Sequence, residues 1–81
     1  MTPKLPVVFG LECIRVLEKV GYKVVRQKSS HTRLKDINGK LPPVTVPDHK
    51  GLHHKELRPG LLRKILKDAE LTVEEFIQLY K

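Results

Sequence analysis

The chain is 81 residues long and carries sixteen Lys and Arg against nine Asp and Glu, for a formal net charge of +7. A chain of this length forms one small domain around a single core, which excludes a separate cofactor domain. The charge surplus favours a polyanionic partner, with nucleic acid first and an acidic protein second.

The only cysteine, Cys13, excludes an internal disulfide and a multi-cysteine zinc site. It falls on the apolar side of the first expected helix, so we interpret it as a buried, inert thiol. Residues 1–9 are mildly apolar and too short for a signal peptide or a membrane span. We therefore expect a cytoplasmic protein without membrane association.

An amphipathic helix is predicted over residues 10–20 because apolar residues recur there at intervals of three and four. That stripe consists of Cys13, Ile14, Leu17 and Val20. Gly21 follows directly and can take the left-handed conformation that closes a helix. Residues 22–27 are rich in β-forming side chains and are predicted to form a strand.

A second strand is predicted over residues 31–35, where apolar and polar side chains alternate as in a sheet with one covered and one wet face. Thr32 and Leu34 take the covered side. The wet side receives His31, Arg33 and Lys35, since residues two apart point to the same face.

Residues 36–39, Asp-Ile-Asn-Gly, are a predicted turn because Asn-Gly is a strong hairpin signal. Residues 44–46 form a third strand bounded by prolines, which belong at strand ends or edges. A polar loop over residues 48–57 holds three of the four histidines: His49, His53 and His54. Their spacing could be that of zinc ligands, but a glycine argues against a helix there and no cysteine assists, so a plain polar loop is favoured.

A second helix is predicted over residues 59–69, with Pro59 suited to its first position. Its outward face carries Arg63, Lys64 and Lys67. Residues 72–75, Thr-Val-Glu-Glu, form a capping box for a short C-terminal helix.

Three strands joined in sequence make an antiparallel meander, and helices before and after it would cover one face. We therefore expect a single α+β domain over residues 1–81, in the order helix, three strands, helix and short helix. The other sheet face, with His31 and Arg33, is expected to be open to solvent.

Four segments in order resemble the HicA toxins, also called YcfA-like mRNA interferases: Gly21-Tyr22, Val25 to His31, Val44 to His49 and Gly60 to Leu66. The resemblance spans nearly the whole chain. It implies a fold like that of double-stranded-RNA-binding domains and a type II toxin that cleaves mRNA until a HicB-type antitoxin binds it. The family's functional histidine follows a Gly-Ser pair and corresponds to His31, with Ser29 here in place of the usual glycine.

Cleavage of RNA without a metal or another cofactor needs a base for the 2′-hydroxyl proton and a cation to hold the phosphate. An imidazole can exchange a proton near neutral pH, and a guanidinium is shaped to bind phosphate. We predict His31 as the general base, the alternative being a solvated strand histidine. Lys28 and Arg33 are predicted to contact phosphate, or else only to keep the surface soluble.

Other candidates have two interpretations each. Ser30 and Thr32 flank His31 and either hydrogen-bond phosphate or simply form a turn. His49 matches the family's Pro-x-His pattern and is either a second acid or a loop anchor. The helix cations Arg63, Lys64 and Lys67 form a solvated face or, in the arrangement of double-stranded-RNA-binding domains, bind phosphate.

Two other functions remain open at this point. The first is a non-catalytic RNA-binding module of the same fold. The second is an interaction protein whose basic surface meets an acidic partner. Replacing His31 with alanine distinguishes the nuclease from the binding module, whereas weak, strongly salt-sensitive RNA retention beside much tighter partner binding would mark the interaction protein.

Overall fold

The computed structural model describes residues 5–28, 31–47 and 56–80. Six elements follow one another in these residues: α1 (Gly10–Lys19), β1 (Tyr22–Lys28), β2 (His31–Asp36), β3 (Val44–Pro47), α2 (Pro59–Asp68) and α3 (Val73–Tyr80). All six elements predicted from the sequence are confirmed, with ends that differ by a residue or so.

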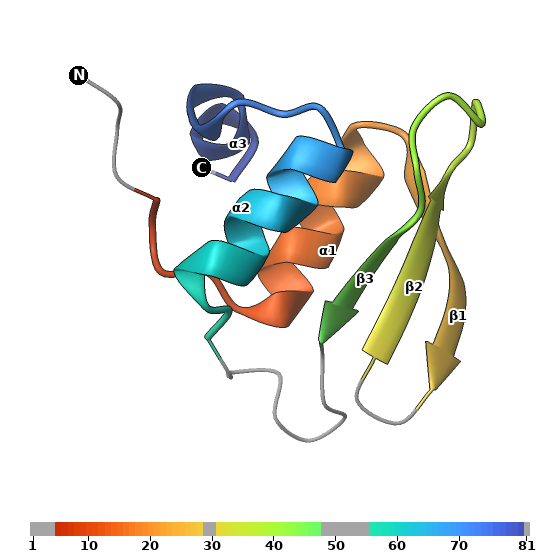
Figure 1. Ribbon diagram of the computed structural model, residues 1–81, viewed down its shortest axis with the longest axis horizontal. Coiled ribbons are helices and arrows are strands. Elements are labelled where there is room, and N and C mark those ends of the chain that lie inside the picture. Colours follow the sequence, from red (N-terminus) through yellow and green to blue (C-terminus); the bar gives the residue numbers. More distant parts are fainter. Residues whose placement is uncertain (1–4, 29–30, 48–55, 81) are drawn as a thin grey trace.

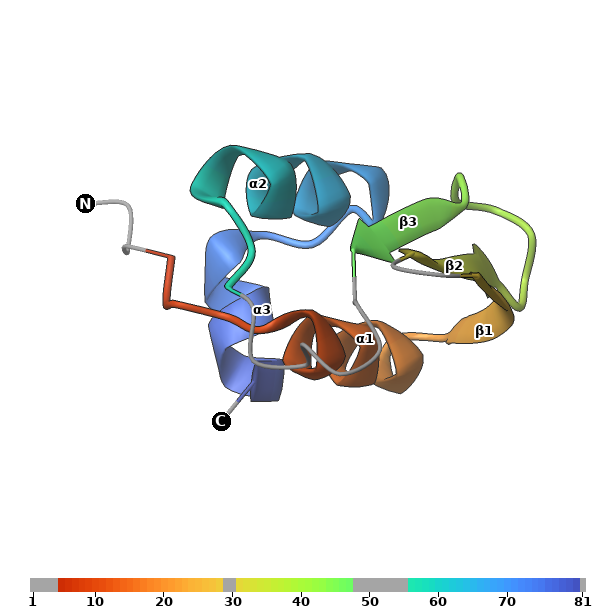
Figure 2. The same cartoon turned by 90° about the horizontal axis from the view of Figure 1, so that it is seen from below.

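The three strands form one antiparallel sheet in the order β1-β2-β3, so the central strand β2 begins with His31. Helices α1 and α2 lie on one side of the sheet, and α3 packs on α1 farther from the strands (Figures 1 and 2). No helix of the described residues lies on the other face of the sheet. The predicted α+β fold with its helices on one face is therefore confirmed.

The core lies between the sheet and the two helices that cover it. Its fully buried members come from every element: Val8, Cys13, Leu17, Tyr22, Leu34, Val46, Leu62 and Phe76. Phe76 brings α3 into this core and stacks on Tyr80 with ring centroids 5.9 Å apart. None of the helices within residues 5–28, 31–47 and 56–80 is both long and apolar enough to cross a membrane.

Helix ends follow the sequence signals closely. Gly21 has a φ of 106°, in the left-handed region that the prediction required. The capping box before α3 is formed, since the Glu75 N–H donates to Thr72 Oγ1 and the Thr72 N–H donates to Glu75 Oε1, both at 3.0 Å. At the end of α2 the left-handed position is taken by Glu70, with a φ of 53°.

The connection between β2 and β3 is longer than a tight hairpin. A turn begins at Asp36 as predicted, but its carboxylate also accepts N–H groups farther along, from Lys40 and Leu41, both at 3.0 Å. The N–H of Asn38 donates to the other carboxylate oxygen at 3.1 Å. These hydrogen bonds, that from Asn38 foremost, hold the pKa of Asp36 below its ordinary value.

Candidate active site and nucleic-acid interface

His31 opens the central strand and lies exposed at one end of the sheet. Its partner on β1 is Lys28 and its partner on β3 is Pro47. Cα atoms of directly opposed residues in an antiparallel pair are about 4.5–5.5 Å apart. Arg33 lies two residues along β2 on the same face, about 6.6 Å from His31 along the strand. An imidazole, an ammonium group and a guanidinium thus share one corner of the open sheet face.

A β-bulge at Val25 sets which β1 side chains reach this face. The register pairs Val24 with Leu34 and then Arg26 with Arg33, so Val25 is the extra residue. Without the bulge, regular alternation would place Gln27 opposite His31. With it, Lys28 takes that position and Arg26 stands opposite Arg33. The bulge therefore moves two cations onto the face that carries His31.

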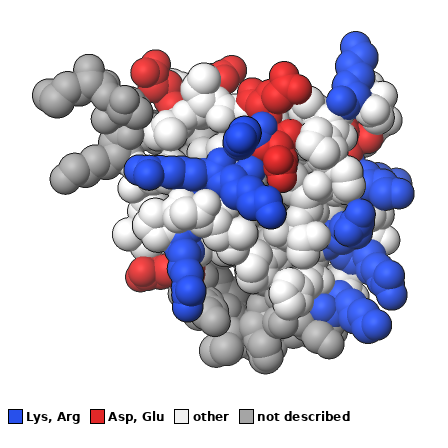
Figure 3. Space-filling model, in the orientation of Figure 1, with Lys and Arg blue, Asp and Glu red and all other residues white. Residues whose placement is uncertain are grey.

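The same face continues as two parallel columns of cations. Three consecutive pairs that share the open face join Lys28 to His31, Arg26 to Arg33, and Lys23 to Lys35. All of these side chains are exposed. We call the five Lys and Arg residues the cationic strip: Lys23, Arg26, Lys28, Arg33 and Lys35. In Figure 3 Lys and Arg side chains gather down the right-hand edge, over the sheet.

Like charges directly opposite each other on a sheet are destabilising by a few tenths of a kcal/mol up to about 1 kcal/mol. The strip contains two such pairs, and within the described residues no carboxylate forms an ion pair with any of its members. The sheet would be more stable with neutral residues at these positions. Binding of a polyanionic partner would explain why the sheet keeps these like-charged pairs in spite of the loss of stability.

Thr32 does not belong to this face. Its side chain is 2 % exposed and lies on the covered side between Gln27 and Val46. Its hydroxyl therefore cannot reach a phosphate bound beside His31, and that interpretation of Thr32 was wrong. Strand alternation is the reason, because neighbours along a strand point to opposite faces. The predicted contacts Ser30 and His49, as well as Ser29, lie outside the described residues.

The predicted α2 cations form a separate group. All three are exposed, as expected: Arg63, Lys64 and Lys67. Because α2 lies on the covered side of the sheet, they do not continue the cationic strip. Figure 3 shows this second group of blue side chains near the centre of the view, over α2, apart from the group at the sheet.

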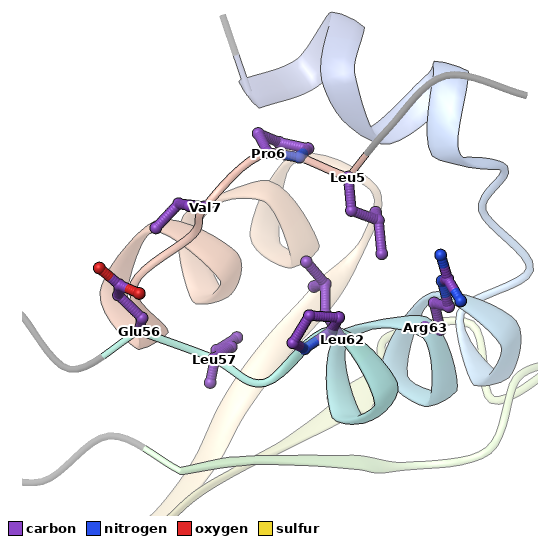
Figure 4. Close-up of a pocket in the computed structure, with 8 residues that line it drawn as sticks. Leu5, Pro6, Val7, Glu56, Leu57, Leu62 and Arg63 are labelled. Carbon is purple, nitrogen blue, oxygen red and sulfur yellow. The ribbon is translucent and has the colours of Figure 1, made fainter.

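Two shallow grooves lie at the start of α2. The larger, about 360 Å³, is lined in part by Pro47, Leu61 and the oppositely charged pair Glu56 and Arg58. Since Pro47 pairs with His31, this groove lies across β3 from the site. The other, about 290 Å³, separates the N-terminal segment from α2. Figure 4 shows Leu5 and Leu62 inside that second groove, with Glu56 and Arg63 at opposite ends.

Three members of the strip were not among the residues selected from the sequence: Lys23, Arg26 and Lys35. Period-two alternation back from Lys28 and on from Arg33 would have found Arg26 and Lys35. Lys23 is five residues from Lys28, so regular alternation would place the two lysines on opposite faces of the sheet, and only the bulge at Val25 brings them to the same face. No pattern in the sequence marks that bulge.

Among the described residues the other reactive side chains offer no rival site. Cys13 is fully buried, and burial raises the pKa of its thiol to about 12, which confirms the inert thiol. Among residues 5–28, 31–47 and 56–80 no three His, Cys, Asp or Glu side chains gather as metal ligands. The histidines at 49, 53 and 54 fall outside these ranges.

Comparison with known proteins gives one family. Residues 10–71 match the profile of the family described as HicA toxin of bacterial toxin-antitoxin systems. The match takes in α1, the whole sheet and α2, and so includes His31 and the cationic strip. A search of curated proteins finds no match for this chain.

Proposed function

The chain belongs to the HicA toxin family of bacterial toxin-antitoxin systems, and from this premise we propose that it is a metal-independent endoribonuclease that cuts mRNA with His31 as general base. The observation that carries the proposal is the position of His31 on the open face, opposite Lys28 and two residues from Arg33. Nuclease activity is in keeping with the family, whose members act as mRNA interferases.

In the proposed reaction His31 takes the proton of a 2′-hydroxyl. The freed oxygen attacks the neighbouring phosphorus, so a bond from phosphorus to the 2′-oxygen forms and the bond to the 5′-oxygen of the next nucleotide breaks. Lys28 and Arg33 hold the phosphate oxygens while negative charge develops on them. The 5′-oxygen leaves with a proton from an acid, for which His49 or water is the candidate. The products are a 2′,3′-cyclic phosphate and a 5′-hydroxyl.

A positioned general base contributes about a hundred- to ten-thousand-fold to such a rate. The test is incubation of labelled single-stranded RNA with the protein in excess chelator, beside His31→Ala and a matched surface variant, Arg15→Gln. Arg15 is exposed on α1, away from the open sheet face. We expect wild type and Arg15→Gln to cut equally and His31→Ala to lose at least about a hundredfold.

Retention of RNA without cleavage by the wild type would replace the nuclease with a non-catalytic RNA-binding module. Equal cleavage by wild type and His31→Ala would move the general base elsewhere, with His49 as the next residue to replace. A far-ultraviolet circular dichroism spectrum of each variant separates lost chemistry from lost folding.

As a toxin of this family, the protein acts with an antitoxin, and we propose one of the HicB type. The open sheet face is the surface that such an inhibitor has to cover, and its positive charge favours an acidic partner. We further propose that residues 1–81 act as one domain in the cytoplasm, where mRNA is found. Replacing Lys23 and Lys35 with glutamate should weaken co-purification with the antitoxin, because it reverses the charge of the surface that the antitoxin covers.

A further inference from the structure

The cationic strip has the dimensions of a binding track for one nucleic-acid strand. Its two columns, one on β1 and one on β2, lie about 5 Å apart. Along β2 the strip extends about 13 Å from His31 to Lys35. The cationic strip is therefore wide enough for one row of phosphates and long enough for a few nucleotides.

The strip carries no Phe, Tyr or Trp side chain on which a base could stack. The chain has two Phe, two Tyr and no Trp, and none of the four lies among the strip residues. Tyr22 and Phe76 are buried, Phe9 precedes α1, and Tyr80 lies on α3. Bases are read by hydrogen bonds to their edges, stacking tolerates any base, and contacts of Lys and Arg with phosphate carry no sequence information.

The strip also lies to one side of His31. The pair of His31 with Lys28 is the last in the register of β1 and β2, and every other cationic pair comes after it in the same direction. Across β3 the groove beside Pro47 carries one arginine and one glutamate, Arg58 and Glu56, whose charges offset. The described cations of the open face thus extend in one direction only.

From these features we infer that the strip binds a single RNA strand by its phosphates, over the nucleotides on one side of the scissile phosphate, without reading their bases. The inference rests on the proposed function, because that function puts the scissile phosphate at His31 and Lys28. The pair Lys23 and Lys35 then holds the phosphates farthest from the cut. Cleavage depends on nucleotides on that side, whatever their sequence.

The salt dependence of binding gives the expected size of this effect. For single strands, log K falls with log[salt] by about 0.7 per phosphate neutralised. The strip has three rows of paired side chains in a track one phosphate wide, so it neutralises about three phosphates and predicts a slope of about −2.1. Loss of the row formed by Lys23 and Lys35 reduces that slope by about 0.7, which is about fivefold in affinity at 0.1 M salt relative to 1 M.

The test uses DNA oligonucleotides that contain a single ribonucleotide, because only its 2′-hydroxyl can act as nucleophile and the cut is then at a defined place. One to five deoxynucleotides are added on the 5′ side or on the 3′ side, and kcat/KM is measured at 0.1 M salt for each. The variants are Lys23→Gln/Lys35→Gln and a control with the same change in charge, Arg15→Gln/Lys40→Gln. Both control residues are exposed, on α1 and in the loop after β2.

We expect kcat/KM to rise about fivefold with length on the side that the strip covers. The rise should disappear in Lys23→Gln/Lys35→Gln, stay in the control, and not depend on the added bases. Removing like charges from one pair relieves repulsion, so the variant should fold. A rise that is kept in Lys23→Gln/Lys35→Gln, or one that depends on the added bases, would overturn the inference.

Failure of the proposed function looks different. In that case the wild type leaves every oligonucleotide intact, and fluorescence anisotropy with the same strands still measures affinity against length. Base-independent growth of affinity with length that needs Lys23 and Lys35 would support the strip as a track without the cut. Affinity that does not depend on these two lysines would refute the track.

Discussion

Thr32 is the one polar residue buried among the described parts of the chain, and its replacement by valine is expected to stabilise the protein. Its side chain is 2 % exposed, and its Oγ1 has no hydrogen-bond partner within the described parts of the chain. Valine has nearly the same shape and the same branching at Cβ, so it fits the strand without new rotamer strain. Its second methyl group would occupy the position of the hydroxyl beside Val46.

The size of the effect follows from the desolvated hydroxyl. An unsatisfied buried polar group costs about 1–3 kcal/mol, and a valine in its place removes that cost. We expect Thr32→Val to raise the free energy of unfolding by about 1–2 kcal/mol. In a domain of this size each kcal/mol corresponds to about 4–8 °C in Tm. Thermal unfolding followed by circular dichroism measures the shift.

Thr45→Val is the matched control. Thr45 is exposed on β3 opposite Arg33, so the same substitution there should change stability by no more than about 0.5 kcal/mol. RNA cleavage by Thr32→Val should equal that of the wild type, since the hydroxyl faces the core. Lower stability of Thr32→Val would mean that the hydroxyl has a partner, and lost cleavage with intact folding would mean that it faces the substrate.

Two further predictions concern positions outside the site. Glu70 ends α2 with a φ of 53°, a conformation that costs an L-residue about 1–2 kcal/mol, so Glu70→Gly should raise stability by about 0.5–1 kcal/mol in urea unfolding. Glu70→Ala keeps the Cβ atom, and an equal gain there would show that backbone strain is not the cause. The backbone N–H groups that bind the Asp36 carboxylate lower its pKa in the folded state, so its contribution to stability is present above the ordinary pKa of aspartate and is lost as pH falls through the folded value. Between pH 7 and pH 2 the free energy of unfolding should therefore fall less for Asp36→Asn than for the wild type. Identical dependence on pH in the two proteins would contradict a lowered pKa of Asp36 in the folded state.

The fold was predictable because local signals and the global pattern agree. The apolar stripe of α1, the glycine after it and the capping box of α3 each determine one element from a few neighbouring residues. Leu62, not Leu61, is the buried residue at the start of α2, a choice that periodicity alone left open. Such choices depend on how an element is rotated against its neighbours, which the sequence of that element does not contain.

The site was predictable in part. The position of His31 and Arg33 on the open face follows from alternation along β2, and the structure agrees. The bulge at Val25 could not be predicted, because it depends on how β1 pairs with β2 and leaves no mark in the pattern of apolar residues. From the sequence, Lys28 was predicted only as a neighbour of His31 along the chain. The register shows that Lys28 lies directly opposite His31, and it also defines the other members of the strip.

The central claim is that a 2′-hydroxyl activated by His31 cuts the strand, and the end chemistry of the fragments tests it most directly. A DNA oligonucleotide with one ribonucleotide and its all-DNA counterpart are incubated in excess chelator with wild type and with His31→Ala, and the products are weighed by mass spectrometry. If His31 activates the 2′-hydroxyl, we expect one cut, by the wild type only, directly 3′ of the ribonucleotide. One fragment should end in a 2′,3′-cyclic phosphate and the other should begin with a 5′-hydroxyl. Cleavage of the all-DNA strand, or undiminished cleavage by His31→Ala, would contradict it.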